Sequence, residues 1–325
     1  MKFQMNPLAR FGVLGFSLAL AGTLQSAQIF NLHADKFTKT LPGGVEVEMW
    51  GFGLGTADAT VPGPTLAVAP TESEIVIYLT NNLEVPISLV IPGQNGFVRD
   101  GAHGTFTDSQ GRERARSFVK ETQPGQWSEY RWNNVGAGTF LYHSGSHVAL
   151  QVQMGLYGAL KRDNASGQAY AGTPYTTEVS LLLSEIDVDV HEAVRLNQYG
   201  TTIKSMIHSV PEYFLVNGEP YTDGQTPPIP AGAVGQTTLF RLLNACYDTR
   251  VPVLNGQYLK VIAEDGQKYA WPKEQVAVTL PALKTIDALW VPDSAEELML
   301  YDRRLNLVNG PAPDGGLYQP LTVTP

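Results

Sequence analysis

This chain of 325 residues has almost no cysteine and little positive charge. Cys246 is the only cysteine, and 22 Lys and Arg residues face 31 Asp and Glu. One cysteine cannot form an internal disulfide, so stability must come from packed secondary structure. The longest basic cluster, GRERARSF at residues 111–118, is short and is interrupted by Glu113. With a net charge of −9, this pattern excludes nucleic acid as an expected partner.

Long hydrophobic runs are also missing, so we expect no membrane span. The apolar stretch FGVLGFSLALAGTL, residues 11–24, is too short to cross a bilayer. It follows Lys2 and Arg10 and leads into small residues up to Ala27, which is the layout of a secretory signal peptide. We therefore expect residues 1–27 to be a signal peptide cleaved near Ala27, and the mature protein to be periplasmic or extracellular.

Turn residues are abundant, with 32 Gly and 22 Pro, and they separate short runs rich in β-branched and aromatic residues. This pattern predicts an all-β protein. The expected strands fall in two series, at residues 45–53, 73–80, 127–132 and 138–143, and then at 178–186, 213–218, 237–245, 258–266, 275–282 and 285–291. We predict one β-sandwich over residues 28–163 and a second over 175–325, joined by a polar linker at 161–175. Only residues 189–200 have a mildly helical pattern.

Several phrases resemble the multicopper oxidase family. VPGPTLAVAPTESEIVIYLTNNL, residues 61–83, and the segment from Ser117 to Leu160 resemble the first cupredoxin domain of these enzymes. Residues 213–221, 237–266 and 275–291 look like the second, ligand-poor domain of the three-domain laccase type. The resemblance covers nearly all of the expected mature chain. It implies two cupredoxin-like Greek-key β-sandwich domains, kinship with oxidoreductases, and copper as cofactor.

Counting ligands limits what the resemblance implies. A complete family member holds a type-1 copper with two His and one Cys, and a trinuclear cluster with eight His, whereas this chain has six His in total. The first His-x-His pair of the family should follow NNLEVP, where Ser88 and Val90 stand instead. Cys246 has no histidine nearby in sequence, so we predict a buried apolar residue. The chain cannot supply both copper centres alone.

The remaining candidate is His143-Ser-Gly-Ser-His147. The resemblance matches His147 to the second histidine of the family's Tyr-His-Ser-His motif. Two extra residues separate His143 from the position of the first histidine. Four strand positions span about 13 Å, but a bulge or tight turn at Gly145 would let both imidazoles reach one copper ion. His103, in the preceding loop, is a candidate third ligand. The alternative is a relic whose histidines make ordinary hydrogen bonds.

The other candidate residues have plainer interpretations. Met154 is expected in the core, and His33, His191 and His208 lie in polar sequence settings without an assigned role.

Three classes of function remain. The first is an exported copper-binding protein with incomplete copper sites and no laccase activity alone. The second is a copper-free scaffold or interaction module, or the N-terminal part of a larger oxidase. The third, a complete oxidase assembled across subunits, ranks last because the second domain has neither a type-1 site nor His pairs. The substrate stays open, as does association with a partner chain or into a homo-oligomer.

Overall fold

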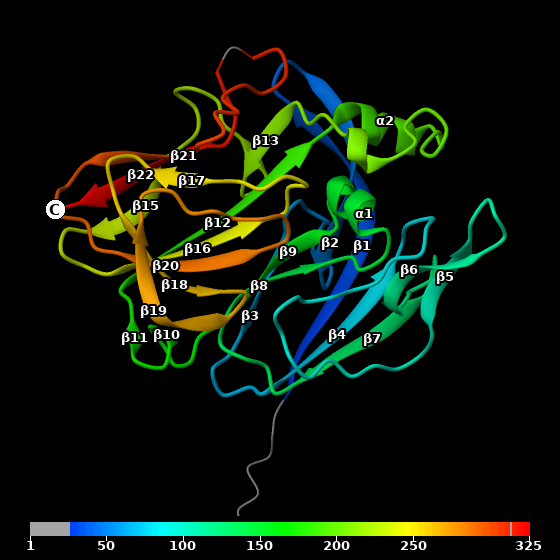
Figure 1. The fold of residues 1–325 in the computed structure, drawn as a ribbon, viewed down its shortest axis with the longest axis horizontal. Helices are drawn as coiled ribbons and strands as arrows, with labels where there is room; N and C mark the ends of the chain where they lie inside the picture. Colours follow the sequence, from blue (N-terminus) through cyan, green and yellow to red (C-terminus); the bar gives the residue numbers. More distant parts are fainter. Residues whose placement is uncertain (1–26, 313) are drawn as a thin grey trace, which may run out of the picture.

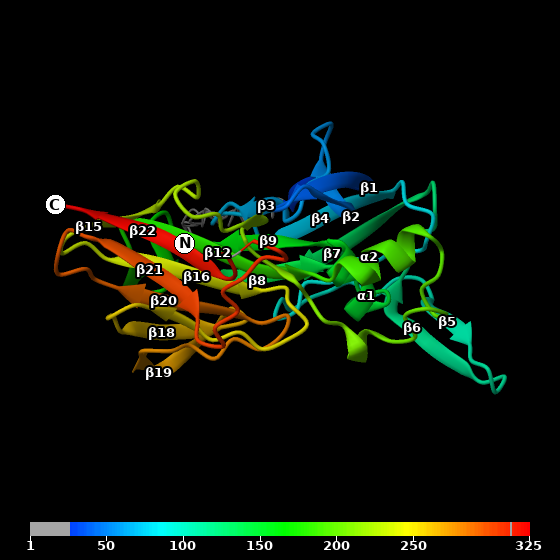
Figure 2. The ribbon, with the colours of Figure 1, turned by 90° about the horizontal axis from the view of Figure 1, so that it is seen from above.

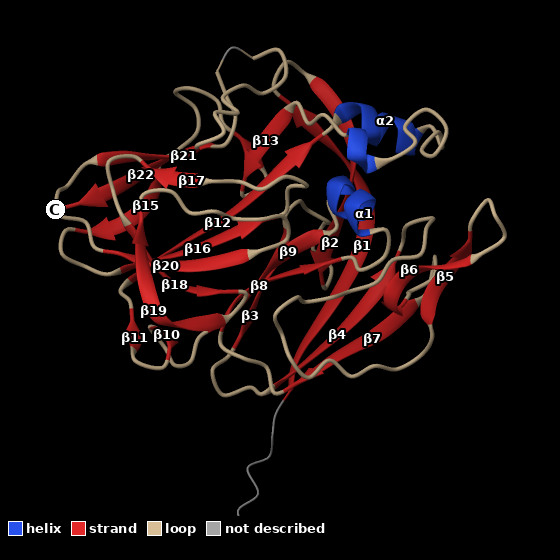
Figure 3. Ribbon diagram, in the orientation of Figure 1, coloured by secondary structure: helices blue, strands red, loops and turns tan. Residues whose placement is uncertain are grey.

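The computed structural model describes residues 27–312 and 314–325, and these residues form a predominantly β fold (Figure 1 and Figure 3). The α-helices of the described residues are α1 (Val148–Met154) and α2 (Val188–Arg195). The all-β prediction is confirmed. None of the helices in this part of the chain is long and apolar enough to cross a membrane. The predicted signal peptide, apart from Ala27, lies outside the described residues.

The first half of the chain contributes two facing sheets. One sheet has the order β2-β1-β4-β7, and the other has the order β3-β9-β8. Their strands are β1 (Ala27–Leu41), β2 (Val45–Leu54), β3 (Gly63–Val68), β4 (Glu74–Asn81), β7 (Trp127–Asn133), β8 (Gly138–His143) and β9 (Tyr157–Arg162). β1 runs parallel to β4, and β3 runs parallel to β9, so neither sheet is a simple meander.

The core of this half follows from alternation along the strands. In β4, Ile75, Ile77 and Leu79 are completely buried, because every second side chain points to the same face. They share one hydrophobic cluster with Leu66 of β3 and Leu160 of β9 in the opposite sheet. Full burial of each such side chain contributes about 1.5–3 kcal/mol.

A separate hairpin extends from this half. It consists of β5 (His103–Thr107) and β6 (Glu113–Lys120), which form a two-stranded sheet of their own, and it projects from the body (Figure 2). Phe118 on this hairpin is 81% exposed. The strand predictions did not include it.

The second half contributes a seven-stranded sheet and a four-stranded sheet. Their orders are β14-β13-β12-β16-β20-β18-β19 and β15-β22-β21-β17. The strands are β12 (Thr177–Ile186), β13 (Tyr213–Val216), β14 (Glu219–Pro220), β15 (Ile229–Ala233), β16 (Thr238–Asn244), β17 (Pro252–Leu254), β18 (Leu259–Glu264), β19 (Gln267–Gln275), β20 (Thr285–Trp290), β21 (Glu297–Asp302) and β22 (Tyr318–Thr324). A second hydrophobic cluster, including Leu242 and Leu321, fills the space between these sheets.

A third hydrophobic cluster joins the two halves. It combines Met49 and Leu141 from the first half with Leu215 and Leu243 from the second. Polar contacts reinforce it at β8, where the Thr139 hydroxyl donates to Asp287 at 2.5 Å.

The predicted polar linker is an ordered hairpin. Within residues 161–175, β10 (Gln168–Tyr170) pairs with β11 (Thr173–Pro174). The Tyr170 side chain is buried, and its hydroxyl donates to Asp287 at 2.5 Å. The aromatic residue therefore anchors the connection to the second half. The exact domain boundaries at 163 and 175 stay predictions.

Other local expectations have mixed outcomes. The helical pattern at 189–200 corresponds to α2, which Asp187 caps by accepting a hydrogen bond from Val190 N. The strand expected at 275–282 is wrong: most of that segment is irregular, and β19 precedes it. The strand-like run after His143 contains α1. The strand propensity of this segment does not determine its structure, because tertiary contacts stabilise the helix. For example, Gln151 Nε2 donates a hydrogen bond to Pro86 O at 2.9 Å.

Candidate functional site

The candidate site lies where β8 ends, and a group of buried serines forms its centre. Ser144 and Ser146 follow β8, Ser88 lies in the segment after β4, and Ser117 belongs to β6. All four are 0–1% exposed. We call these four residues the serine cluster.

Hydrogen bonds connect the members of the serine cluster to one another and to neighbouring protein groups. Ser88 Oγ lies 3.2 Å from Ser117 Oγ and 3.0 Å from Ser146 Oγ. Ser144 Oγ donates to Gln151 Oε1 at 2.5 Å and lies 3.3 Å from the donor Ser88 N. A hydroxyl both donates and accepts, so such a group can satisfy itself in a buried site.

A half-buried ion pair adjoins the serine cluster. Arg116 Nε and Nη2 donate to the two carboxylate oxygens of Glu121 at 3.0 and 2.5 Å, and Ser146 Oγ donates to Glu121 Oε1 at 2.7 Å. Burial raises the pKa of Glu121, but the hydrogen bonds from Arg116 and Ser146 outweigh burial and leave this pKa below its ordinary value. The carboxylate is therefore ionised and neutralised by Arg116, and is not a free metal ligand.

His143 is buried at the end of β8, with 3% of its surface exposed. Its backbone bonds to Val90 in both directions, at 2.9 and 3.0 Å. The ring nitrogen Nδ1 lies 2.8 Å from Ser144 O, and Nε2 is buried without a hydrogen-bond partner. Burial lowers the pKa of His143 to about 4, so the imidazole is neutral at physiological pH. With Nδ1–H donating to Ser144, the lone pair lies on Nε2.

His147 has a different setting. It is an exposed residue at the N-cap of α1, in the left-handed conformation with φ 40° and ψ 52°. Its ring centroid lies 6.3 Å from that of Phe106, and its imidazole makes no hydrogen bond within the described residues. Partial burial and the nearby Arg116 guanidinium lower the pKa of His147.

The expected role of Gly145 is wrong in its mechanism. Gly145 does not have a positive φ. The residue of this loop in the left-handed conformation is His147. A small residue is required for space: a Cβ atom at Gly145 would lie 2.8 Å from Val90 Cγ1 and 3.0 Å from Ser88 Oγ. The glycine allows close packing against the segment that holds Ser88 and Val90.

The three predicted ligands do not meet as a trio. His103 is an exposed residue on the projecting hairpin, in β5. Among residues 27–312 and 314–325, no group of three or more His, Cys, Asp or Glu side chains could hold a metal ion. Copper binding by His143 and His147 as a pair stays a prediction. Sequence reasoning missed Glu121 and Arg116, because only the fold brings them to the serine cluster.

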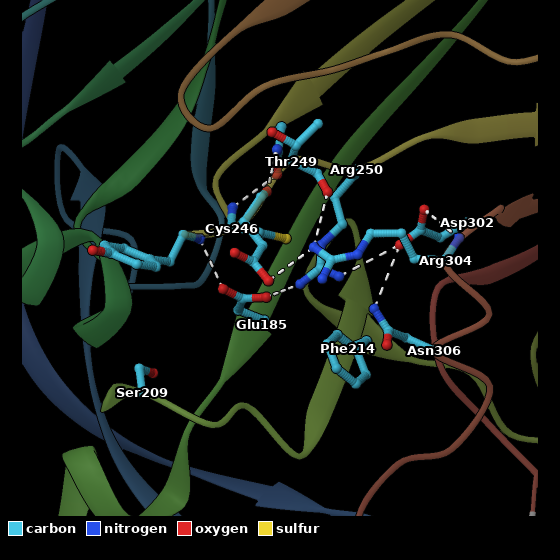
Figure 4. A network of polar contacts seen from close by, with 12 residues as sticks. Glu185, Ser209, Phe214, Cys246, Thr249, Arg250, Asp302, Arg304 and Asn306 are labelled. Carbon is cyan, nitrogen blue, oxygen red and sulfur yellow. Dashed lines mark hydrogen bonds and ion pairs between the residues drawn. The ribbon is translucent and has the colours of Figure 1, made fainter. Parts of the chain in front are cut away.

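Cys246 lies in a second buried network, as Figure 4 shows. It is 1% exposed, which confirms the prediction of a buried residue. Arg250 forms ion pairs with Glu185 and Asp302, and Cys246 lies beside Glu185 and Arg250. Burial raises the pKa of the Cys246 thiol well above its ordinary value. Without a metal, the thiol is therefore protonated at neutral pH.

The remaining candidates divide between core and surface. Met154 is completely buried in the first core, as predicted. His191 is 1% exposed, with its ring nitrogens 2.8 Å from Glu48 O and 3.0 Å from Gln153 O. His33 pairs with Asp35 at 2.5 Å, and His208 is exposed.

Comparison with known proteins identifies the fold. Residues 38–164 match the family model described as multicopper oxidase. The structure resembles blue copper oxidase from Nitrosomonas europaea, at 19% identity and TM-score 0.72, over 92% of this chain and 86% of that one. Copper nitrite reductase from Nitrosomonas europaea is similar at 17% identity and TM-score 0.66, over 92% and 94% of the two chains.

Laccase from Botrytis aclada is similar over 91% of this chain but 52% of its own, at 19% identity and TM-score 0.64. No curated protein sequence matches. The predicted cupredoxin-like fold and the resemblance to multicopper oxidases are confirmed.

Proposed function

We propose that this chain is an exported protein with incomplete copper sites and no laccase activity by itself. Residues 38–164 match the multicopper oxidase family model, which supports the kinship. The observation that carries the proposal is the serine cluster. Ser88 stands where the resemblance places a copper-binding histidine, and its hydroxyl bonds to Ser117 and Ser146. A neutral serine hydroxyl lacks the nitrogen or thiolate donor that copper prefers.

The residues present do not fit the copper centres of a complete oxidase. A type-1 site needs a cysteine thiolate with histidines, whereas the side chains beside Cys246 are those of Glu185 and Arg250. A trinuclear cluster needs many histidines, and the described residues bring no three candidate ligands together. No electron-transfer step is therefore assigned to this chain.

The pair that could hold a single copper ion is His143 and His147. Each imidazole has a ring nitrogen without a hydrogen-bond partner among the described residues. Copper(II) binds nitrogen ligands more tightly than other first-row divalent ions do. A bound ion would be a Lewis-acid centre.

The second candidate function is a copper-free scaffold. The observation that favours it is the serine cluster together with the Arg116–Glu121 pair, which satisfy each other's hydrogen bonds without a metal. Both candidates include export through the segment that ends near Ala27. N-terminal sequencing of the protein from its native host tests export, because retention of residues 1–20 would contradict it.

Copper calorimetry on the metal-free protein distinguishes the two candidates. We expect one copper ion per chain in the wild type, and loss of most of the affinity in His147→Ala, whose side chain is exposed enough for the fold to tolerate the change. His208→Ala, another exposed histidine, is the matched control and should bind like the wild type. Equal affinity in the wild type and the His143→Ala/His147→Ala double variant would favour the scaffold and reject the copper pair.

A further inference from the structure

Two pockets lie on either side of the start of α1. One has a volume of about 260 Å³ and is lined by residues of α1 together with Ala245, Cys246, Ala282 and Leu283 from the second half. The other, of about 290 Å³, is lined by the first turn of α1 and by Tyr199, Met206 and Ile207. Val148, Ala149 and Tyr247 line both pockets, so these residues form the shared wall.

The first pocket is an apolar slot between the two halves of the molecule. Its walls include Val148, Val152, Ala245 and Leu283, which also belong to or pack against the cluster that joins the halves. Pockets for small molecules occur preferentially at such interfaces, in apolar surroundings. The aliphatic walls suit an aliphatic chain, whose transfer from water contributes about 0.8 kcal/mol per buried methylene.

The second pocket also contains polar groups, the hydroxyls of two tyrosines. Tyr199 and Tyr247 both line it, and neither hydroxyl has a hydrogen-bond partner among the described residues. Tyr247 is 45% exposed, and Ile207 beside it is 75% exposed. An exposed apolar rim beside free hydroxyls is typical of a binding site for an amphiphilic molecule.

The charges of the residues around the pockets indicate which polar head group the ligand carries. Apart from the exposed His147, whose pKa is lowered, the residues that line the two pockets are uncharged. The nearby Arg116 is already paired with Glu121. A carboxylate head would therefore lose hydration without gaining a counter-charge, whereas a hydroxyl or carbonyl oxygen would need only the tyrosine hydroxyls.

We propose that the two pockets bind one neutral amphiphile, an aliphatic alcohol or ketone, with its chain in the slot beside Val152 and its oxygen at Tyr199 and Tyr247. This site needs no copper, and His147, which lines the second pocket, is the one residue that it shares with the proposed copper pair. The two pockets, of about 260 and 290 Å³, lie at the small end of typical ligand pockets, which hold about 300–1,000 Å³. The ligand must therefore be a small molecule.

Titration calorimetry with 1-octanol, on protein kept metal-free with EDTA, tests the proposal. We expect saturable binding at one site per chain. Ala149→Phe fills the shared wall and should weaken binding roughly tenfold or more, since overpacking at the site removes room for the ligand. Tyr247→Phe removes one hydroxyl and should weaken binding about threefold to tenfold, the loss of one hydrogen bond.

Controls separate the site from general hydrophobic binding. Ala282→Phe blocks the slot from the opposite wall, so it repeats the test without changing α1. Ala295→Phe makes the same substitution at an exposed position outside both pockets and should leave binding unchanged. Octanoate should bind more weakly than 1-octanol. Unchanged affinity in both Ala149→Phe and Ala282→Phe, or tighter binding of octanoate, would overturn the proposal.

Discussion

His143 makes the stability of the protein depend on pH. Its folded-state pKa is about 4, below the unfolded value of about 6.5, because burial disfavours the charged ring. Between these values the unfolded chain binds a proton that the folded chain does not. Stability is therefore full above about pH 6.5 and falls as the pH drops to about 4, by up to roughly 3 kcal/mol.

Urea unfolding at a series of pH values measures this effect. His143→Gln removes the titrating ring and should flatten the decline, although buried His191, whose pKa is also lowered, keeps part of it. The exposed His208 gives the control, since His208→Gln should decline like the wild type. An unchanged slope in His143→Gln would contradict the assignment of a neutral, buried imidazole.

At the scale of elements, the loop between β8 and α1 depends on the missing side chain of Gly145. Gly145→Ala should lower the free energy of unfolding by about 1–3 kcal/mol, because the new methyl group overpacks against Val90 and Ser88. Gly136→Ala is the matched control: its Cβ would meet only Gln94 Oε1 at 3.9 Å, so its stability should stay close to that of the wild type. Equal stability of the two variants would reject the close packing at Gly145.

The elements also show how far the sequence predicts the structure. β2, β7 and β8 match the strands predicted at 45–53, 127–132 and 138–143. These strands could be predicted because the residue pattern that indicates a strand lies within each segment. α1 and the β10–β11 hairpin were missed, since tertiary contacts such as that of Tyr170 with Asp287 determine them.

For the site, the resemblance identified Ser88 and Val90 as the residues in place of the family's first histidine pair, and the structure places Val90 against His143 and Ser88 in the serine cluster. The sequence could not reveal that the Arg116–Glu121 pair adjoins the serine cluster, or that the His143 ring is buried, because both result from how distant segments pack.

At the scale of the whole molecule, Thr139 joins the two halves. Its hydroxyl donates to Asp287 and accepts from Arg241 Nη1 at 2.9 Å, all within the buried interface. Thr139→Val keeps the shape but leaves the Asp287 carboxylate short of a donor, which should cost about 1–3 kcal/mol of unfolding free energy. Thr65→Val, at an exposed strand position, should be nearly neutral. Urea unfolding that cannot distinguish the two variants would mean that this contact does not join the halves.

The central claim is that a cupredoxin-like fold persists here without the copper centres of an oxidase. The most direct test is the visible absorption spectrum of the purified protein after loading with copper, recorded together with oxygen uptake in the presence of a phenol. Because Cys246 lies buried beside Glu185 and Arg250, and Ser88 and Val90 stand in place of a histidine pair, we predict no intense blue thiolate-to-copper band and no oxygen uptake. A blue preparation that turns over would contradict the account.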